Sequence, residues 1–166
     1  MQEASSPLTA RELLRMSKAN LDDLFRASQP GPIPVGEGVG TVIFMPGTFV
    51  ASPMATFAKV FLWQGKVVNP VKGELKNRIF PFSFKGIRAK VYPDTSWLDE
   101  RECTLLDYSK TSLVAKPIRD EIRLVAPGLY LGIVYIGKKK TVDFALDFNE
   151  KLAGFVTRLK RAFGAG

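Results

Sequence analysis

Residues 118–148 read IRDEIRLVA-PG-LYLGIVYI-GKKK-TVDFALDF, and their pattern is the main evidence for the fold class. In its first and last parts, apolar and charged residues alternate with a period of two, which is typical of β-strands with one buried face. The middle part, 129–137, is apolar at almost every position, so we expect both of its faces to be covered. Pro127-Gly128 and residues 137–140 supply the turns between these parts. The stretch therefore predicts three consecutive antiparallel strands.

The same period of two extends upstream as far as Val39. Short connections favour antiparallel pairing of neighbouring strands, and eight such strands remove their exposed edges by closing into a barrel. The predicted fold is therefore mainly β, an eight-stranded antiparallel barrel. Its predicted strands are 39–45, 65–70, 74–82, 86–92, 103–109, 118–126, 129–137 and 141–148.

A helix is predicted before the barrel. Thr9 and Glu12 form a capping box, in which each side chain satisfies a backbone N–H at the helix start. Leucine and phenylalanine then recur at helical spacing up to Ala27, and the proline-rich residues 29–34 end the pattern. We therefore expect one amphipathic N-terminal helix followed by a Pro/Gly linker.

Two further helices are predicted. Ser52-Pro53 favours a short helix inserted over residues 52–61, with serine as its cap and proline in its first turn. After Asn149, apolar residues recur at helical spacing, and we expect this terminal helix to dock on the barrel rather than insert into a bilayer. The predicted organisation is one structural domain, with 1–38 as helix and linker, 39–148 as barrel and 149–166 as terminal helix.

The composition excludes several kinds of chemistry. The 166 residues carry 24 lysines and arginines against 16 aspartates and glutamates, a net charge of +8, and include no histidine. Without histidine, the chain cannot form a His-liganded haem or zinc site, or a Ser-His or Cys-His catalytic pair. Cys103 is the only cysteine, which excludes an internal disulfide and a cysteine metal cage. We expect no cofactor and no metal, and a soluble, cytoplasmic protein.

The order of the predicted elements resembles that of the calycin group, which contains lipocalins, fatty-acid-binding proteins and nitrobindin-like barrels. The resemblance is one of architecture over roughly residues 39–163, and Trp63-Gln64-Gly65-Lys66 is similar to the tryptophan-glycine signature of such barrels. It implies a lipocalin-like barrel that holds an apolar ligand inside. Nitrobindin-like proteins bind haem through a histidine, so the resemblance does not extend to that activity.

The segment 118–124 has the highest density of charge on a predicted strand, and its orientation has two interpretations. In the first, Arg119, Glu121 and Arg123 form a ladder of ion pairs outside the barrel, and the isoleucines and Asp120 face the lumen. In the second, the arginines point inward and the isoleucines lie under a covering helix. The first is favoured because charges are rarely buried without partners. Either orientation brings at least one ionisable group to the cavity.

Arginine and tyrosine side chains suit recognition of an anionic or carbonyl head group. A guanidinium offers a bidentate fork, and a phenol adds a second donor, an arrangement that fatty-acid-binding proteins use. We therefore expect one of the two arginines to anchor a ligand, with tyrosines and carboxylates nearby and a tryptophan at the entrance. The candidate ligand-binding residues are Trp63, Asp107, Tyr108, Arg119, Asp120, Glu121, Arg123, Tyr130 and Tyr135.

The predicted function is the binding of a small hydrophobic or amphipathic ligand, lipid-like and with an anionic group, inside the barrel. One alternative is a cofactor-independent isomerase or cyclase that uses cavity carboxylates and tyrosines. Another is an interaction module that acts through the basic segment 59–90, where a turn about Ser83 would place Lys76 opposite Lys90. Weak contact with an anionic membrane surface is expected, whereas the sequence lacks motifs for nucleic-acid binding.

Overall fold

The computed structural model describes residues 8–43, 62–69, 74–80, 88–109 and 117–149. Two helices, α1 (Ala10–Leu13) and α2 (Lys18–Ala27), precede the strands. The predicted inserted helix over 52–61 lies outside the described residues, and so does the predicted terminal helix beyond residue 149. The described helices hold no segment long and apolar enough to cross a membrane.

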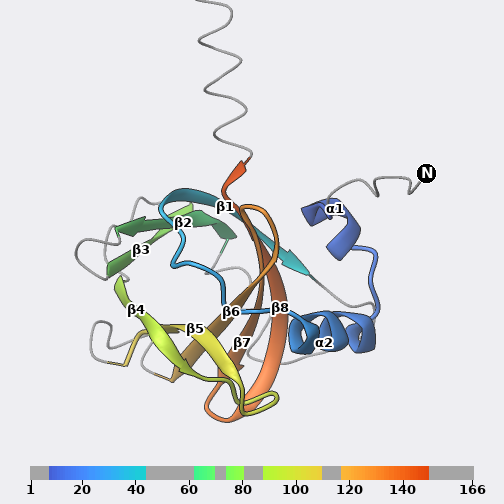
Figure 1. Cartoon of the computed structure of the whole chain (residues 1–166). Coiled ribbons are helices and arrows are strands. Elements are labelled where there is room, and N and C mark those ends of the chain that lie inside the picture. The colour runs from blue at the N-terminus through green and yellow to red at the C-terminus, as the bar shows by residue number, and fades with distance from the viewer. Residues whose placement is uncertain (1–7, 44–61, 70–73, 81–87, 110–116, 150–166) are drawn as a thin grey trace, which may run out of the picture.

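The strands make one antiparallel sheet in which each strand pairs with the next along the chain. Strand β1 also pairs with β8, from Val39 opposite Asp147 to Ile43 opposite Asp143, so the sheet closes on itself as a barrel (Figure 1). The prediction of a mainly β, antiparallel fold is confirmed. Within the described residues, the strands are β1 (Gly36–Ile43), β2 (Leu62–Asn69), β3 (Glu74–Phe80), β4 (Arg88–Thr95), β5 (Glu102–Asp107), β6 (Ile118–Ala126), β7 (Leu129–Ile136) and β8 (Lys139–Asp147).

The turns of the last three strands follow the sequence signals. Gly128 has a φ of 70° between β6 and β7, and Gly137 has a φ of 61° between β7 and β8. These left-handed conformations are accessible to glycine without the steric penalty that a Cβ brings. The predicted turn at 127–128 matches the first hairpin, whereas the second turn is shorter than the predicted 137–140, because β8 already begins at Lys139.

The N-terminal helical region differs from the prediction, because it contains two helices instead of one. Thr9 caps α1 with the predicted capping box to Glu12. Ser17 then adopts an extended backbone, and its side chain accepts a hydrogen bond from the backbone N–H of Asn20. A serine in this role starts a new helix, so the apolar pattern to Ala27 spans a break.

The register of the β3–β4 hairpin also differs from the prediction. Lys76 is opposite Arg88, and Glu74 is opposite Lys90. The expected pairing of Lys76 with Lys90 is therefore wrong by two residues. A like-charge pair remains in this hairpin, Lys76 opposite Arg88, whereas an acid stands opposite Lys90.

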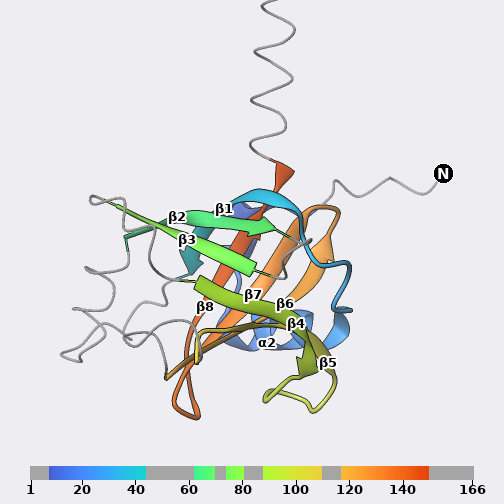
Figure 2. The same ribbon diagram turned by 90° about the vertical axis from the view of Figure 1, so that its left-hand side faces the viewer.

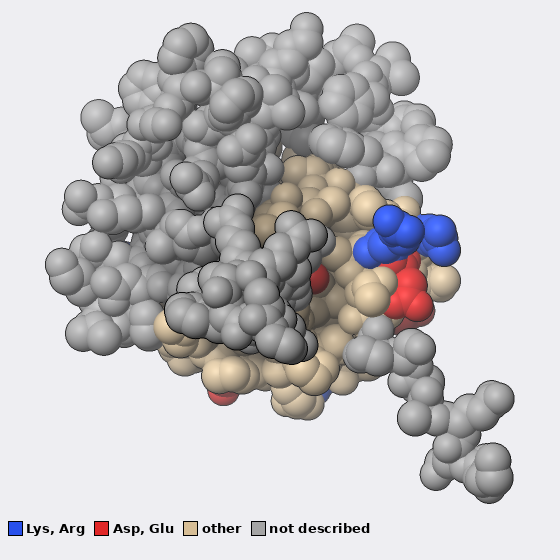
Figure 3. All heavy atoms as spheres, turned by 90° about the horizontal axis from the view of Figure 1, so that it is seen from above, with Lys and Arg blue, Asp and Glu red and all other residues tan. Residues whose placement is uncertain are grey.

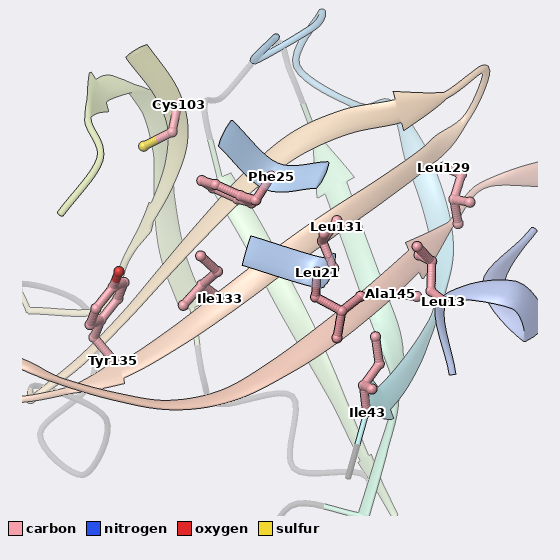
Figure 4. Close-up of a cluster of buried hydrophobic side chains, with 10 residues drawn as sticks. All are labelled: Leu13, Leu21, Phe25, Ile43, Cys103, Leu129, Leu131, Ile133, Tyr135 and Ala145. Carbon is pink, nitrogen blue, oxygen red and sulfur yellow. The ribbon is translucent and has the colours of Figure 1, made fainter. Parts of the chain in front are cut away.

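The two faces of the sheet carry two separate hydrophobic clusters. The lumen cluster faces the barrel interior and consists of Val91, Leu106, Tyr108, Ile118, Ile122, Tyr130, Phe144 and Leu146. The outer cluster joins α1 and α2 to the outside of the sheet and consists of Leu13, Leu21, Phe25, Ile43, Cys103, Leu129, Leu131, Ile133, Tyr135 and Ala145 (Figure 4). Both faces of β7 are thus covered, and its outer cover includes residues of the N-terminal helices.

Candidate functional site

Strand β6 presents its apolar residues to the lumen and its arginines to the outside. Ile118 and Ile122 belong to the lumen cluster, and Asp120 lies on the same face by the period of two. Arg119, Glu121 and Arg123 lie on the opposite face. This is the first of the two predicted orientations, with one difference: the charged ladder is buried rather than solvated.

Arg123 is completely buried between β6, helix α2 and the turn at 96–101. Its guanidinium donates to both carboxylate oxygens of Asp99, at 2.6 and 2.7 Å, and to the backbone carbonyl of Glu102 at 3.0 Å. It also donates to the carbonyl of Phe25 at 2.9 Å and stacks on the Phe25 ring at 4.6 Å. Arg123 therefore adds a second donor to a carbonyl that already accepts from the Ser28 backbone N–H, at the C-terminal end of α2, where a cation is favoured.

Glu121 is also completely buried, at the centre of a second set of contacts. Its carboxylate accepts hydrogen bonds from the Ser96 hydroxyl at 2.6 Å and from the backbone N–H of Trp97 at 2.9 Å. Arg119 donates to Glu121 at 2.8 Å and to Asp94 at 3.0 Å, and its guanidinium lies 4.5 Å from the centre of the Trp97 ring. Glu121 thus holds the turn at 96–101 against the barrel.

The prediction that Arg119 or Arg123 anchors a ligand head group in the lumen is wrong. Both guanidinium groups lie on the outer face, and their donors are engaged by Asp94, Asp99 and backbone carbonyls. Glu121 is likewise structural. The sequence signal that was overlooked is the end of α2, whose last carbonyls accept donors from elsewhere in the chain.

The polar groups on the described part of the lumen face include a tyrosine–aspartate pair and a second tyrosine. The Tyr108 hydroxyl donates to Asp120 at 2.9 Å, and both residues are buried. The Tyr130 hydroxyl donates to the carbonyl of Pro32 at 2.8 Å, and its ring packs edge-on against Phe148. Burial raises the pKa of Tyr130, so the phenol stays protonated at neutral pH. The structure therefore brings three of the predicted site residues to the lumen.

The remaining predicted residues do not join this group. Asp107 lies on the outer face of β5 and accepts a hydrogen bond from the Tyr92 hydroxyl at 2.9 Å. Burial together with this hydrogen bond raises the pKa of Tyr92 to about 12. Tyr135 belongs to the outer cluster, where burial raises its pKa. Tyr130 and Tyr135 thus lie on opposite faces of β7. The backbone of Trp63 lies in β2, and its side chain is outside the described part.

One wall of the lumen is shaped by a close contact between Gly132 of β7 and Phe144 of β8. A Cβ atom at Gly132 would lie 2.2 Å from Cζ of Phe144, so the ring lies directly on the glycine backbone. The two residues are opposite one another in the strand pairing. Because the ring lies flat on this wall, it projects less into the lumen.

Gly132→Ala is therefore expected to push the Phe144 ring off the wall and to destabilise the protein by about 1–3 kcal/mol, the usual effect of overpacking. Urea unfolding followed by circular dichroism measures this change. The double variant Gly132→Ala/Phe144→Leu should recover much of the loss, because the shorter side chain relieves the contact. A double variant as unstable as the single one would contradict this explanation.

Charged residues also connect α2 to β8 on the outside of the barrel. Lys140 lies 2.8 Å from Asp143 and contacts Asp22 of α2. Burial raises the pKa of Asp143. Viewed from above, lysine or arginine side chains lie directly beside acidic ones on the described part of the surface (Figure 3). No cluster of three or more potential metal ligands occurs among the described residues.

Comparisons with known proteins identify the fold only. A crystal structure of a protein from Thermomonospora curvata matches with a TM-score of 0.58, over 83% of this chain and 96% of the other. The two sequences are 15% identical, so the likeness concerns architecture and carries no activity with it. No family profile and no curated protein matches the chain. By fold, the chain is a mainly β protein with an antiparallel sheet.

Proposed function

We propose that the protein is a lipocalin-like barrel that binds a small hydrophobic or amphipathic molecule in its lumen. The observation that carries this proposal is the buried Tyr108–Asp120 hydrogen bond beside the aliphatic and aromatic side chains of the lumen cluster. A few polar groups in an apolar enclosure are the usual composition of a small-molecule site. Eight strands give a barrel interior wide enough for side chains or for one small ligand.

The ligand's polar group is expected to be neutral. The arginines that would attract an anion lie on the outer face and are engaged by aspartates and backbone carbonyls. The described lumen face offers phenols and a carboxylate, which suit a hydroxyl or an amide better than a second carboxylate. The lipid-like ligand of the proposal is therefore a neutral amphiphile, such as a long-chain alcohol.

A second candidate function uses the same pair of residues. A carboxylate bonded to a phenol in an apolar enclosure is an arrangement that can move a proton, as a cofactor-independent isomerase requires. Turnover of any bound molecule, followed by mass spectrometry, distinguishes an isomerase from a binding protein. We also propose a cytoplasmic location, which a single buried cysteine allows.

The first experiment is to identify small molecules that co-purify with the native protein, by mass spectrometry of a denatured sample. The second is a titration with N-phenyl-1-naphthylamine, a neutral probe that fluoresces in apolar surroundings. Saturable binding of the probe, displaced by the co-purified molecule, is the expected result. A protein that neither retains a small molecule nor binds the probe would contradict the proposed function.

Tyr108→Phe tests whether the lumen pair contacts the ligand. Removing the hydroxyl should weaken binding of a long-chain alcohol by about 2- to 10-fold, which corresponds to one net hydrogen bond of 0.5–1.5 kcal/mol. The matched control is Tyr92→Phe, which removes a phenol bonded to an aspartate at the same 2.9 Å on the exposed outer face. Competition against the naphthylamine probe measures both variants. Equal affinities in the two variants would exclude Tyr108 from the site.

A further inference from the structure

The chain between α2 and β1 crosses one end of the barrel. We call these residues, 28–33, the strap. In Figure 1 they pass in front of the barrel between α2 and β1. Gln29 pairs with Leu124, and its carbonyl accepts a hydrogen bond from the Leu124 backbone N–H at 2.9 Å. Pro32 accepts the hydrogen bond from Tyr130. The strap is thus fixed at two points to the strands that it crosses.

The contacts of the strap identify which end it covers. Leu124 lies near the end of β6, Tyr130 at the start of β7, and Phe148 just beyond β8, so all three mark the end at the β6–β7 turn. Figure 2 shows from the side how the chain between α2 and β1 passes the end of the barrel. The side chain of Ile33 is half-buried and packs against the lumen cluster together with these residues. Ile33 therefore forms part of an apolar floor.

The polar pair lies toward the other end of the barrel. Asp120 is four residues before Leu124 on the same strand and the same face, which corresponds to about 13 Å at the usual rise of a β-strand. Tyr108, the partner of Asp120, lies just beyond the end of β5. The buried carboxylate thus lies toward one end of the described lumen, whereas Ile33, Leu124 and Phe148 line the end closed by the strap, where the Tyr130 hydroxyl is engaged by the Pro32 carbonyl.

We propose that an amphipathic ligand lies along the barrel axis with its polar group at Tyr108 and Asp120 and its apolar end against Ile33. Ile33 then determines the longest ligand that the barrel accepts. This inference rests on the proposed function, because it requires that the lumen binds a ligand at all. It adds the orientation of the ligand in the barrel and identifies Ile33 as the residue that determines the preferred ligand length.

The test is the chain-length preference for straight-chain 1-alkanols, measured by displacement of N-phenyl-1-naphthylamine. In the wild-type protein, affinity should rise about fourfold for each added methylene, the value for burying one methylene, until the chain reaches the floor. Ile33→Ala should move the preferred length to a longer alkanol. Ile33→Phe, which adds bulk at the same point, should move it to a shorter one.

The matched control is Val35→Ala, a comparable truncation two residues away, at a side chain that is 68% exposed. It should keep the wild-type length preference. If no alkanol displaces the probe from the wild-type protein, the proposed function fails and this inference fails with it. If alkanols bind but both Ile33 variants keep the wild-type preference, the inference alone is wrong.

Discussion

Arg123→Met is expected to lower the free energy of unfolding by about 3–5 kcal/mol, the usual effect of removing one partner of a buried ion pair. Methionine keeps much of the side-chain volume and removes the donors to Asp99, Glu102 and Phe25. Asp99 then keeps a carboxylate in a half-buried place without the guanidinium that balances it. Urea unfolding followed by tryptophan fluorescence measures the change.

The control for this variant is Arg26→Met on the exposed surface of α2. Arg26 forms an ion pair with Asp23 at 3.2 Å, and both side chains are largely exposed, so its loss should change stability by less than about 1 kcal/mol. A loss in Arg123→Met no larger than the loss in this control would contradict the structural role assigned to Arg123.

The pH dependence of stability provides an independent measurement. The hydrogen bonds from Arg123 hold the pKa of Asp99 below its ordinary value. A carboxyl group whose pKa is lower in the folded state contributes stability above the unfolded pKa, about 3.9, and loses it as the pH falls through the folded pKa. The wild-type protein should therefore lose stability below about pH 4, and Arg123→Met should lack this component.

Phe25→Ala is expected to destabilise the protein by about 3–5 kcal/mol, as truncation of a fully buried phenylalanine commonly does. The Phe25 ring is completely buried in the outer cluster, and Figure 4 shows it among side chains of the barrel strands. The variant also removes the ring on which Arg123 stacks. Thermal unfolding by circular dichroism and urea titration measure the loss.

Leu14→Ala is the control, because Leu14 is 47% exposed just after α1 and its truncation should cost less than about 1 kcal/mol. If Phe25→Ala were as stable as this control, α2 would not be anchored by the outer cluster. A fold in which α2 is only loosely attached would then replace the one described.

Much of the fold could be predicted because its decisive patterns are local. The period of two over 118–124 fixed which residues share a face, and it did not fix which face points inward. The all-apolar strand at 129–136 required a cover on its outer side, and the structure supplies one. The identity of that cover is a question of long-range packing, and residues of α1 and α2 provide it.

The site could be predicted only in part, for the same reason. Tyr108, Asp120 and Tyr130 were candidates because of their place on strands, and they share the lumen face. Arg123 was misassigned because its partner Asp99 is 24 residues away, in a turn that carries no periodic signal. A charged residue on a strand indicates a partner, and the sequence does not identify that partner as a ligand or as another part of the chain.

The anchoring of α2 by Arg123 has a consequence for the order in which the chain assembles. Phe25 and Arg123 are 98 residues apart, so the ribosome releases the helix long before it releases the anchor. Until β6 has emerged, the apolar face of α2 has no place to dock and remains accessible to chaperones. The helix is thus synthesised before the strands but is among the last elements to be secured, and the strap can close the barrel only at that point.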